Sequence, residues 1–235
     1  MIHVTTEGDN VQQRRVTLTF DNGPTPGITE RVLDVLAAHD IATSFFLIGD
    51  RLQERGARSL AERAVAEGHW IGNHTMTHSV QFADASDVGF GIQEIQDAQR
   101  VIGDLAHPDR LFRPYAGGGV FSRSVLTPQA VEHLMKQEHS LVLWNSIPHD
   151  WDQPTAWVDN ALRDIQCQDW TCLVIHDEDN DGAMDHLPEF LDRLRDADVE
   201  IRQDFPDSCV PIRCGELVGP LDHLMPAHTS TRGEI

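Results

Sequence analysis

Short apolar runs and longer amphipathic stretches alternate along most of the chain. The apolar runs have the length and the residue types of β-strands, whereas the stretches between them repeat apolar residues with helical spacing. The predicted strands are residues 16–20, 41–48, 70–71, 111–112, 141–144, 172–175 and 199–201. The predicted helices are residues 28–38, 52–67, 91–105, 128–137, 155–165 and 188–195.

This alternation predicts an α/β fold of parallel strands joined by crossover helices, either a barrel or a doubly wound sheet. The chain has 235 residues, a length at which α/β barrels usually form one domain. No linker rich in Pro, Gly or Ser divides it. We therefore expect one domain at residues 14–215 and a tail of weak periodicity at residues 216–235.

Polar side chains follow the predicted strands close to the point where each strand ends. Because the carboxyl ends of parallel strands lie on one face, these side chains are expected to converge there. One polar residue at a strand end is ordinary, but His, Asp and Arg at five such places indicate a functional site. The residues are Asp21, Asn22, His74, His78, Arg113, Asp150, His176 and Asp177.

His74 and His78 have the spacing of a metal-binding pair. Two imidazoles four residues apart can bind one ion where the backbone is helical or tightly turned, and Gly72 favours a turn. A carboxylate from Asp21 or its neighbour would complete a site of two histidines and one carboxylate. The alternative is a pair of ordinary polar histidines that bind nothing.

Five short motifs occur in order along the chain. They are T-F-D-N-G-P at 19–24, N-H-T-M-T-H at 73–78, R-P-Y at 113–115, D-W at 150–151 and L-V-I-H at 173–176. They resemble the motifs T-F-D-D-G-P, H-S/T-x-x-H, R-x-P-Y/W, D-x-x-D-W and L-x-x-H of the polysaccharide deacetylases, the NodB-homology family. Each motif alone is weak, and the five in sequence make the resemblance specific.

The resemblance implies a distorted seven-stranded (β/α) barrel with its site at the carboxyl ends of the strands. It also implies a hydrolase of non-peptide carbon–nitrogen bonds that removes an acyl group from an N-acetylated sugar or a related small amide. The expected mechanism is metal-assisted attack by water, with Asp21 as the general base and His176 as the acid that protonates the leaving amine. These roles agree with the chemistry of amide hydrolysis, which needs an activated water and a proton for the amine.

By position, the resemblance assigns roles to the remaining motif residues. His74 and His78 would bind a divalent metal, zinc or another transition metal, and Asn22 stands where the family has a third, acidic ligand. Arg113 would orient and tune the base, and the backbone N–H of Tyr115 would help to hold the oxyanion.

Asn22 is the main departure from the family pattern. An amide in place of a carboxylate removes a negative charge, and an amide oxygen suits hard cations better than zinc. We therefore expect weaker metal binding, a different metal or no metal at all. The alternative is that Asn22 only shapes the turn before Gly23 and Pro24.

A second departure lies in the fourth motif. Ile147 stands where the family has the first Asp of D-x-x-D-W, a residue that supports the catalytic histidine. His149 and Asp150 are the two candidates that could support His176 instead.

Two other functions stay open on the sequence. One is a metal-independent amidohydrolase of a small cyclic amide, as in the allantoinase-like branch of the superfamily. The other is a non-catalytic carbohydrate-binding barrel that has lost its metal. Retention of Asp21, Arg113, His176 and both motif histidines favours catalysis.

Charge narrows the choice of partners. The formal net charge is −20, from 38 acidic and 18 basic residues, and such a surface repels nucleic acids and anionic membranes. The first residues show no basic segment followed by an apolar segment, so we expect no secretory signal and a cytoplasmic protein acting on a small molecule or a carbohydrate.

Two further metal sites are weaker hypotheses. Cys167, Cys172, Cys209 and Cys214 form two pairs whose spacing is wider than most structural zinc sites use, so reduced thiols are the simpler interpretation. Residues 177–182, with the sequence D-E-D-N-D-G, resemble the start of a calcium loop, but an acidic solvated loop explains them as well.

Overall fold

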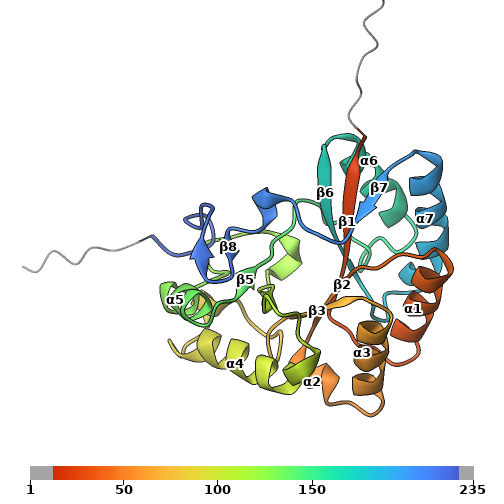
Figure 1. Cartoon of the computed structure of the whole chain (residues 1–235). Helices are drawn as coiled ribbons and strands as arrows, with labels where there is room; N and C mark the ends of the chain where they lie inside the picture. Colours follow the sequence, from red (N-terminus) through yellow and green to blue (C-terminus); the bar gives the residue numbers. More distant parts are fainter. Residues whose placement is uncertain (1–12, 228–235) are drawn as a thin grey trace, which may run out of the picture.

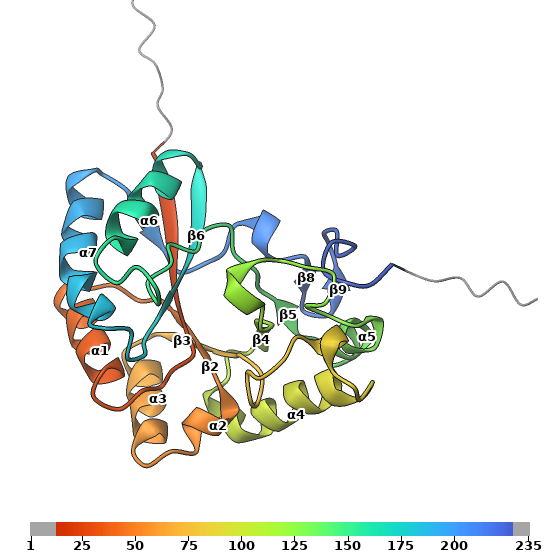
Figure 2. The same ribbon diagram turned by 180° about the vertical axis from the view of Figure 1, so that it is seen from behind.

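The computed structural model describes residues 13–227 and has an α/β architecture. The parallel strands are β1 (Arg15–Asp21), β2 (Ser44–Leu47), β3 (Trp70–Asn73), β4 (Leu111–Phe112), β5 (Ser140–Leu141), β6 (Trp170–His176) and β7 (Glu200–Arg202). The helices are α1 (Thr29–Ala38), α2 (Gly49–Leu52), α3 (Ala57–Ala66), α4 (Phe90–Ile102), α5 (Pro128–Lys136), α6 (Trp157–Gln166) and α7 (Leu187–Asp196). Each predicted strand has a counterpart, although β2 and β5 are shorter than predicted, and this confirms the predicted class (Figures 1 and 2).

The parallel strands curl into a distorted barrel. Their order is β6-β1-β2-β3-β4-β5, so the strands β1 to β5 lie side by side in the order of the chain. One edge of β1 pairs with β6 along its whole length, and the other edge pairs with β7 over residues 15–17 and with β2 over residues 19–21. This arrangement agrees with the barrel rather than with the doubly wound sheet.

The barrel wall closes between β5 and β6 through one short bridge. Ser146, which follows β5, pairs in parallel with Leu173 of β6. The N–H groups of Asn145 and Ser146 both donate to the carbonyl oxygen of Cys172 at 3.2 Å, and Val174 N–H donates to the carbonyl oxygen of Ser146 at 3.1 Å. The seam between these two strands is therefore much shorter than the ladder between β1 and β6.

A hairpin that the sequence did not predict extends the sheet. Strands β8 (Ile212–Arg213) and β9 (Glu216–Leu217) are antiparallel, and β8 pairs with β5. The segment expected to be a tail therefore begins inside this hairpin. Its buried residues Leu221 and Leu224 pack with the core around β4 and β5 as far as residue 227, and the remainder lies outside the described residues.

The predicted helix at 52–67 is interrupted. Gly56 has a φ of 88°, a left-handed conformation that L-residues rarely adopt, and it separates α2 from α3. The other predicted helices are found with small shifts of their ends.

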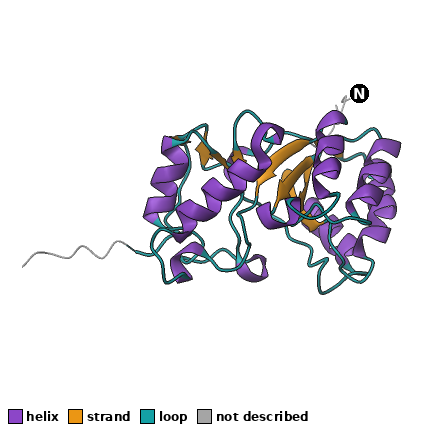
Figure 3. Ribbon diagram, turned by 90° about the horizontal axis from the view of Figure 1, so that it is seen from below, coloured by secondary structure: helices purple, strands orange, loops and turns teal. Residues whose placement is uncertain are grey.

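Two apolar cores lie between the strands and the helices. Side chains alternate along β1, so Val16, Leu18 and Phe20 face the core shared with α1, α6 and α7, while Thr19 and Asp21 face the barrel interior. The second core lies between β4, β5, α4 and α5. Figure 2 shows α1, α3, α6 and α7 on one side of the strands and α4 and α5 on the other, and Figure 3 shows the helices around the outside. No helix within residues 13–227 is long and apolar enough to cross a membrane.

Candidate active site

Asp21 and His176 are brought together by strand register. They are the last residues of the neighbouring strands β1 and β6, and the two strands pair with Asp21 opposite His176. Since the strands are parallel, both side chains reach the same end of the barrel interior. The predicted convergence of polar groups at the carboxyl ends of the strands is therefore found for this pair.

Arg113 lies directly after β4 and points into the barrel interior. Its side chain is fully buried, and Nη1 donates to Asp21 Oδ1 at 2.7 Å and to Thr19 Oγ1 at 2.7 Å. Its guanidinium carbon lies 3.9 Å from the centre of the Phe46 ring. A buried charge of this kind needs a close counter-charge, and Asp21 provides it.

Backbone groups of the opposite wall complete the surroundings of Arg113. Nε donates to the carbonyl oxygen of Val142 at 3.2 Å, and Nη2 donates to that of Leu143 at 3.3 Å. The guanidinium is therefore fixed from both sides of the barrel, and it holds one carboxylate oxygen of Asp21 in place.

The protonation of His74 follows from its hydrogen bond. Nδ1 lies 2.8 Å from the carbonyl oxygen of Arg113. A carbonyl oxygen only accepts, so Nδ1 carries the proton and Nε2 keeps its lone pair. Nε2 lies 3.5 Å from Asp21 Oδ2. Burial lowers the pKa of His74 to about 3, so the ring is neutral at pH 7 and can act as a ligand.

His78 and Tyr115 lie on the next side of the same cavity. The ring centre of His78 is 4.7 Å from that of His74 and 4.3 Å from that of Tyr115. The turn between the two histidines is fixed locally, because Asn73 Oδ1 accepts from Thr75 N–H at 2.9 Å and Thr75 Oγ1 accepts from His78 N–H at 3.0 Å. Burial also lowers the pKa of His78 to about 3.

Asn22 has both a turn conformation and a place in the cavity. Its φ of 77° is left-handed, a region in which Asn is favoured over most residues. Its Nδ2 donates to Glu178 Oε1 at 3.0 Å. Its Oδ1 is buried and accepts no hydrogen bond from any residue between 13 and 227. The turn interpretation and the ligand interpretation are therefore compatible.

Asp150 is the residue that supports His176. Its Oδ1 lies 2.9 Å from His176 Nδ1, and its Oδ2 accepts from the backbone N–H of His176 at 2.9 Å. His149 Nδ1 instead lies 3.5 Å from Asp152 Oδ1, and Ile147 lines the cavity. Asp150 therefore supports His176 although Ile147 replaces the acidic residue that does so in the family pattern.

The charge of Asp150 determines the protonation of His176. Burial acts to lower the pKa of His176, but the charge and the hydrogen bond of Asp150, with smaller contributions from the charges of Asp21 and Glu178, outweigh burial and raise the pKa to about 9. The ring is therefore protonated at pH 7, with Nδ1–H donated to Asp150 and Nε2–H left for another acceptor. An imidazolium of this kind can act as a general acid.

The described residues fit a divalent metal through an unusual set of donors. No group of three or more His, Cys, Asp or Glu side chains is placed to hold a metal ion within residues 13–227. Two neutral imidazoles and the free carbonyl oxygen of Asn22 do line one cavity, and an unsatisfied buried oxygen is the kind of group that a cation would stabilise. His74, His78 and Asn22 are thus able to bind a metal, with less negative charge than a carboxylate would give.

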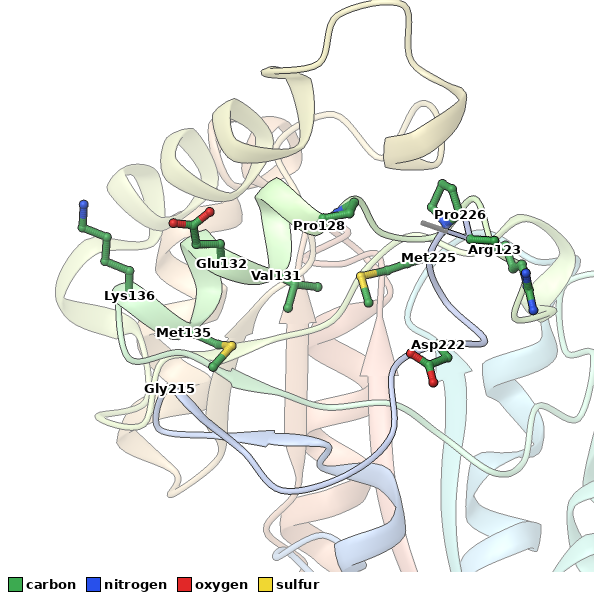
Figure 4. A pocket seen from close by; sticks show the side chains of 11 residues that line it. Arg123, Pro128, Val131, Glu132, Met135, Lys136, Gly215, Asp222, Met225 and Pro226 are labelled. Atoms are coloured by element: carbon green, nitrogen blue, oxygen red, sulfur yellow. The ribbon is translucent and has the colours of Figure 1, made fainter. Parts of the chain in front are cut away.

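The cavity at the site is small and is not the largest in the molecule. It has a volume of about 180 Å³, and Trp144 and Trp151 line it beside Tyr115. A cavity of about 930 Å³ lies between α5 and the segment that follows β9, with Met135 and Met225 on its walls (Figure 4). None of the groups described above lines that larger cavity, so size does not identify the site here.

The acidic segment at 177–182 is tied to the site. Asp177 is fully buried, and it accepts from Gly23 N–H at 3.2 Å and from Thr29 Oγ1 at 2.5 Å. Asn180 Nδ2 lies 3.4 Å from Asp150 Oδ2. Asp177 and Asn180 thus bind other parts of the protein, and no group of three or more acidic side chains in this segment is placed to hold a metal ion. All four cysteines are free thiols, which agrees with the simpler interpretation, and Cys172 is buried in β6.

Glu178 is a site residue that the motifs did not reveal. It lines the cavity and contacts Asn22, although 156 positions separate the two residues in the sequence. The only sequence signal was its position two residues after His176.

Comparisons with known proteins identify the relatives of this chain. A sequence model described as polysaccharide deacetylase matches residues 8–133. The chitooligosaccharide deacetylase of Sinorhizobium fredii is 36% identical over 165 residues, which cover 69% of this chain and 71% of that protein. The peptidoglycan-N-acetylglucosamine deacetylase of Bacillus cereus is 30% identical over 183 residues, which cover 77% of this chain and 80% of that protein.

The fold is similar to that of solved deacetylases. The crystal structure of a polysaccharide deacetylase from Bacillus cereus matches with a TM-score of 0.70 and 25% identity, covering 86% of this chain and 97% of that chain. The residues of the first three motifs lie within the matched range 8–133, whereas Asp150 and His176 lie beyond it. For those two residues, the place in the site rests on the geometry and not on the family model.

Proposed function

Since the chain belongs to the polysaccharide deacetylase family, we propose that it removes N-acetyl groups from N-acetylated oligosaccharides such as chitooligosaccharides. At the level of the family, the protein is a hydrolase of carbon–nitrogen bonds other than peptide bonds. One observation carries the proposal: Asp21, held by Arg113, and His176, held by Asp150, lie side by side at one cavity. That is the base and acid pair that amide hydrolysis requires.

In the first step, Asp21 accepts a proton from the attacking water. Its Oδ1 is held by Arg113 Nη1 at 2.7 Å, so its Oδ2 is the oxygen left to take the proton. Water oxygen bonds to the acetyl carbon, and the carbonyl oxygen becomes an oxyanion. The backbone N–H of Tyr115 is our proposed donor to that oxyanion.

In the second step, His176 protonates the leaving nitrogen. Its Nδ1–H stays on Asp150, so Nε2 delivers the proton as the carbon–nitrogen bond breaks. The products are acetate and the free amine of the sugar. A protonated ring is available at neutral pH because Asp150 raises its pKa to about 9.

Enzymes of this family depend on a divalent metal. In this chain, we propose His74, His78 and Asn22 as the residues that would bind it. When bound, a divalent metal supplies Lewis acidity to the reacting oxygens. An amide oxygen in place of a carboxylate should bind more weakly and should favour a harder cation than zinc.

The aromatic lining of the cavity and the substrates of the relatives support a carbohydrate. A volume of about 180 Å³ is below the range of roughly 300–1,000 Å³ of most ligand pockets, so it would hold only the reacting part of a substrate. Trp144, Trp151 and Tyr115 line its wall, and aromatic side chains of this kind provide apolar surface against which a sugar ring can pack. The relatives act on carbohydrates, which favours deacetylation over a cyclic amide substrate or binding without turnover.

Acetate release from chitooligosaccharides tests the function directly. We expect release by the wild-type protein, with a loss of at least about 100-fold in Asp21→Asn, the usual scale for a general base. Asp222→Asn, which changes an exposed acidic residue, is the matched control and should keep full activity. Equal rates in Asp21→Asn would exclude it as the base, and no acetate from any N-acetylated sugar would exclude the function. A cytoplasmic location stays a prediction from the sequence.

A further inference from the structure

The two ends of the Asn22 amide have different surroundings. Nδ2 donates to Glu178 Oε1 at 3.0 Å, whereas Oδ1 is buried without a donor among residues 13–227. Asn22 is 8% exposed. Both residues line the cavity that His74 and His78 also line.

Glu178 is itself fixed from the other side. Its Oε2 accepts from Arg51 Nη2 at 2.7 Å, and Arg51 Nη1 donates to Thr25 Oγ1 at 3.2 Å. One carboxylate oxygen therefore binds Arg51, and the other faces Asn22. The side chain is only 19% exposed, so few alternative positions are open to it.

A carboxylate selects one orientation of a neighbouring amide. An ionised carboxylate only accepts hydrogen bonds, so the NH₂ end of Asn22 must face Glu178. Turning the amide over would place Oδ1 against Oε1, two acceptors in contact. The amide of Asn22 therefore keeps Nδ2 toward Glu178, and its Oδ1 is left without a hydrogen-bond donor among residues 13–227.

We propose that Glu178 is a positioning residue that presents the Asn22 carbonyl oxygen as the third metal ligand beside His74 and His78. This inference rests on the metal site of the proposed function. Glu178 also brings to the cavity wall a negative charge that Asn22 does not carry. The two residues therefore act together where the family uses one acidic ligand.

A specific consequence concerns an aspartate at position 22. Its carboxylate would lie about 3.0 Å from that of Glu178, the distance that the Nδ2 hydrogen bond now spans. Like charges this close repel. Asn22→Asp should therefore raise the affinity for the metal more in a protein that also carries Glu178→Gln than in one that keeps Glu178.

The first test reads the orientation of the amide in metal-free protein. The side-chain NH₂ signals of Asn22 are assigned by NMR as those missing in Asn22→Asp. We expect their hydrogen exchange to be at least tenfold faster in Glu178→Gln than in wild type. Glu54→Gln, which removes an exposed charge from the adjoining surface hollow, is the matched control and should leave the signals unchanged. Unchanged exchange in Glu178→Gln overturns the proposal.

The second test measures the affinity for manganese and zinc by titration calorimetry in four proteins: wild type, Asn22→Asp, Glu178→Gln and the double variant. Glu178→Gln should lower the affinity roughly tenfold, and the gain from Asn22→Asp should be roughly tenfold larger in the Glu178→Gln background. Equal gains in both backgrounds overturn the proposal.

The outcomes separate the inference from the proposed function. Metal binding by wild type that Glu178→Gln leaves unchanged removes the role of Glu178 and spares the metal site. Absence of binding by wild type removes the metal site and, with it, the ligand role of Asn22. Acetate release by wild type is measured separately and decides the proposed function.

Discussion

Replacing Asp150 by Asn should change His176 from an acid into a neutral base at neutral pH. The two side chains are 2.9 Å apart, and a charge pair at that distance gains roughly 6 kcal/mol at an effective dielectric constant of about 20. Burial opposes this gain. The net rise in the pKa of His176, from 6.5 to about 9, corresponds to about 3 kcal/mol.

Without the charge of Asp150, burial still lowers the pKa of His176 and only the charges of Asp21 and Glu178 still raise it, so the pKa should fall from about 9 toward its ordinary value of 6.5. With a pKa near 6.5, roughly a tenth of the molecules would carry the proton at pH 7.5, so turnover should fall about tenfold. The alkaline limit of activity, expected near pH 9 in wild type, should move toward pH 6.5. Asp152→Asn, an exposed acidic residue that pairs with His149, is the matched control.

Stability should follow the same ionisation. The folded-state pKa of His176 is raised, so its contribution is fully present below pH 6.5 and is lost as the pH rises through about 9. Urea unfolding at pH 6 and pH 10 should show this loss in wild type and not in Asp150→Asn. An NMR titration that finds the pKa of His176 within about 0.5 of its wild-type value in the variant would refute the reasoning.

Three further changes test the scaffold of the site. Arg113→Lys should destabilise the fold by about 3–5 kcal/mol, because one ammonium cannot replace the contacts of a buried guanidinium. Arg110→Lys changes an exposed residue and should have little effect, so equal urea midpoints for the two variants would contradict this prediction. Gly23→Ala places a Cβ against the Asp177 carboxylate and should cost about 1–3 kcal/mol in urea unfolding. A cost below roughly 0.5 kcal/mol would show that the carboxylate moves freely. His74→Ala should abolish the rise in melting temperature that added manganese gives to wild type, and a retained rise would place the metal elsewhere.

The fold was predictable because apolar runs and helical spacing report burial directly. The seven parallel strands each appear as such a run. The hairpin of β8 and β9 was missed because two-residue strands carry no periodicity. The break at Gly56 was missed because alanine and charged residues on both sides continue the helical pattern.

The sequence was enough to select the residues of the site, but it predicted only some of the contacts between them. The motifs selected Asp21, His74 and His176, and the geometry brings them to one cavity. The choice between His149 and Asp150 depended on which side chain the loop after β5 turns toward β6, which no sequence spacing records. The contact of Glu178 with Asn22 depends on the closed barrel in the same way.

The position of Arg113 links the chemistry of the site to the integrity of the barrel. Its partners come from β1 on one wall and from the backbone after β5 on the other, and the wall between β5 and β6 closes through a short seam. Opening that seam would remove the backbone acceptors of the guanidinium and release the carboxylate of Asp21 together. Turnover should therefore require that the bridge between β5 and β6 is intact. In mild denaturant, turnover should be lost before the helices unfold.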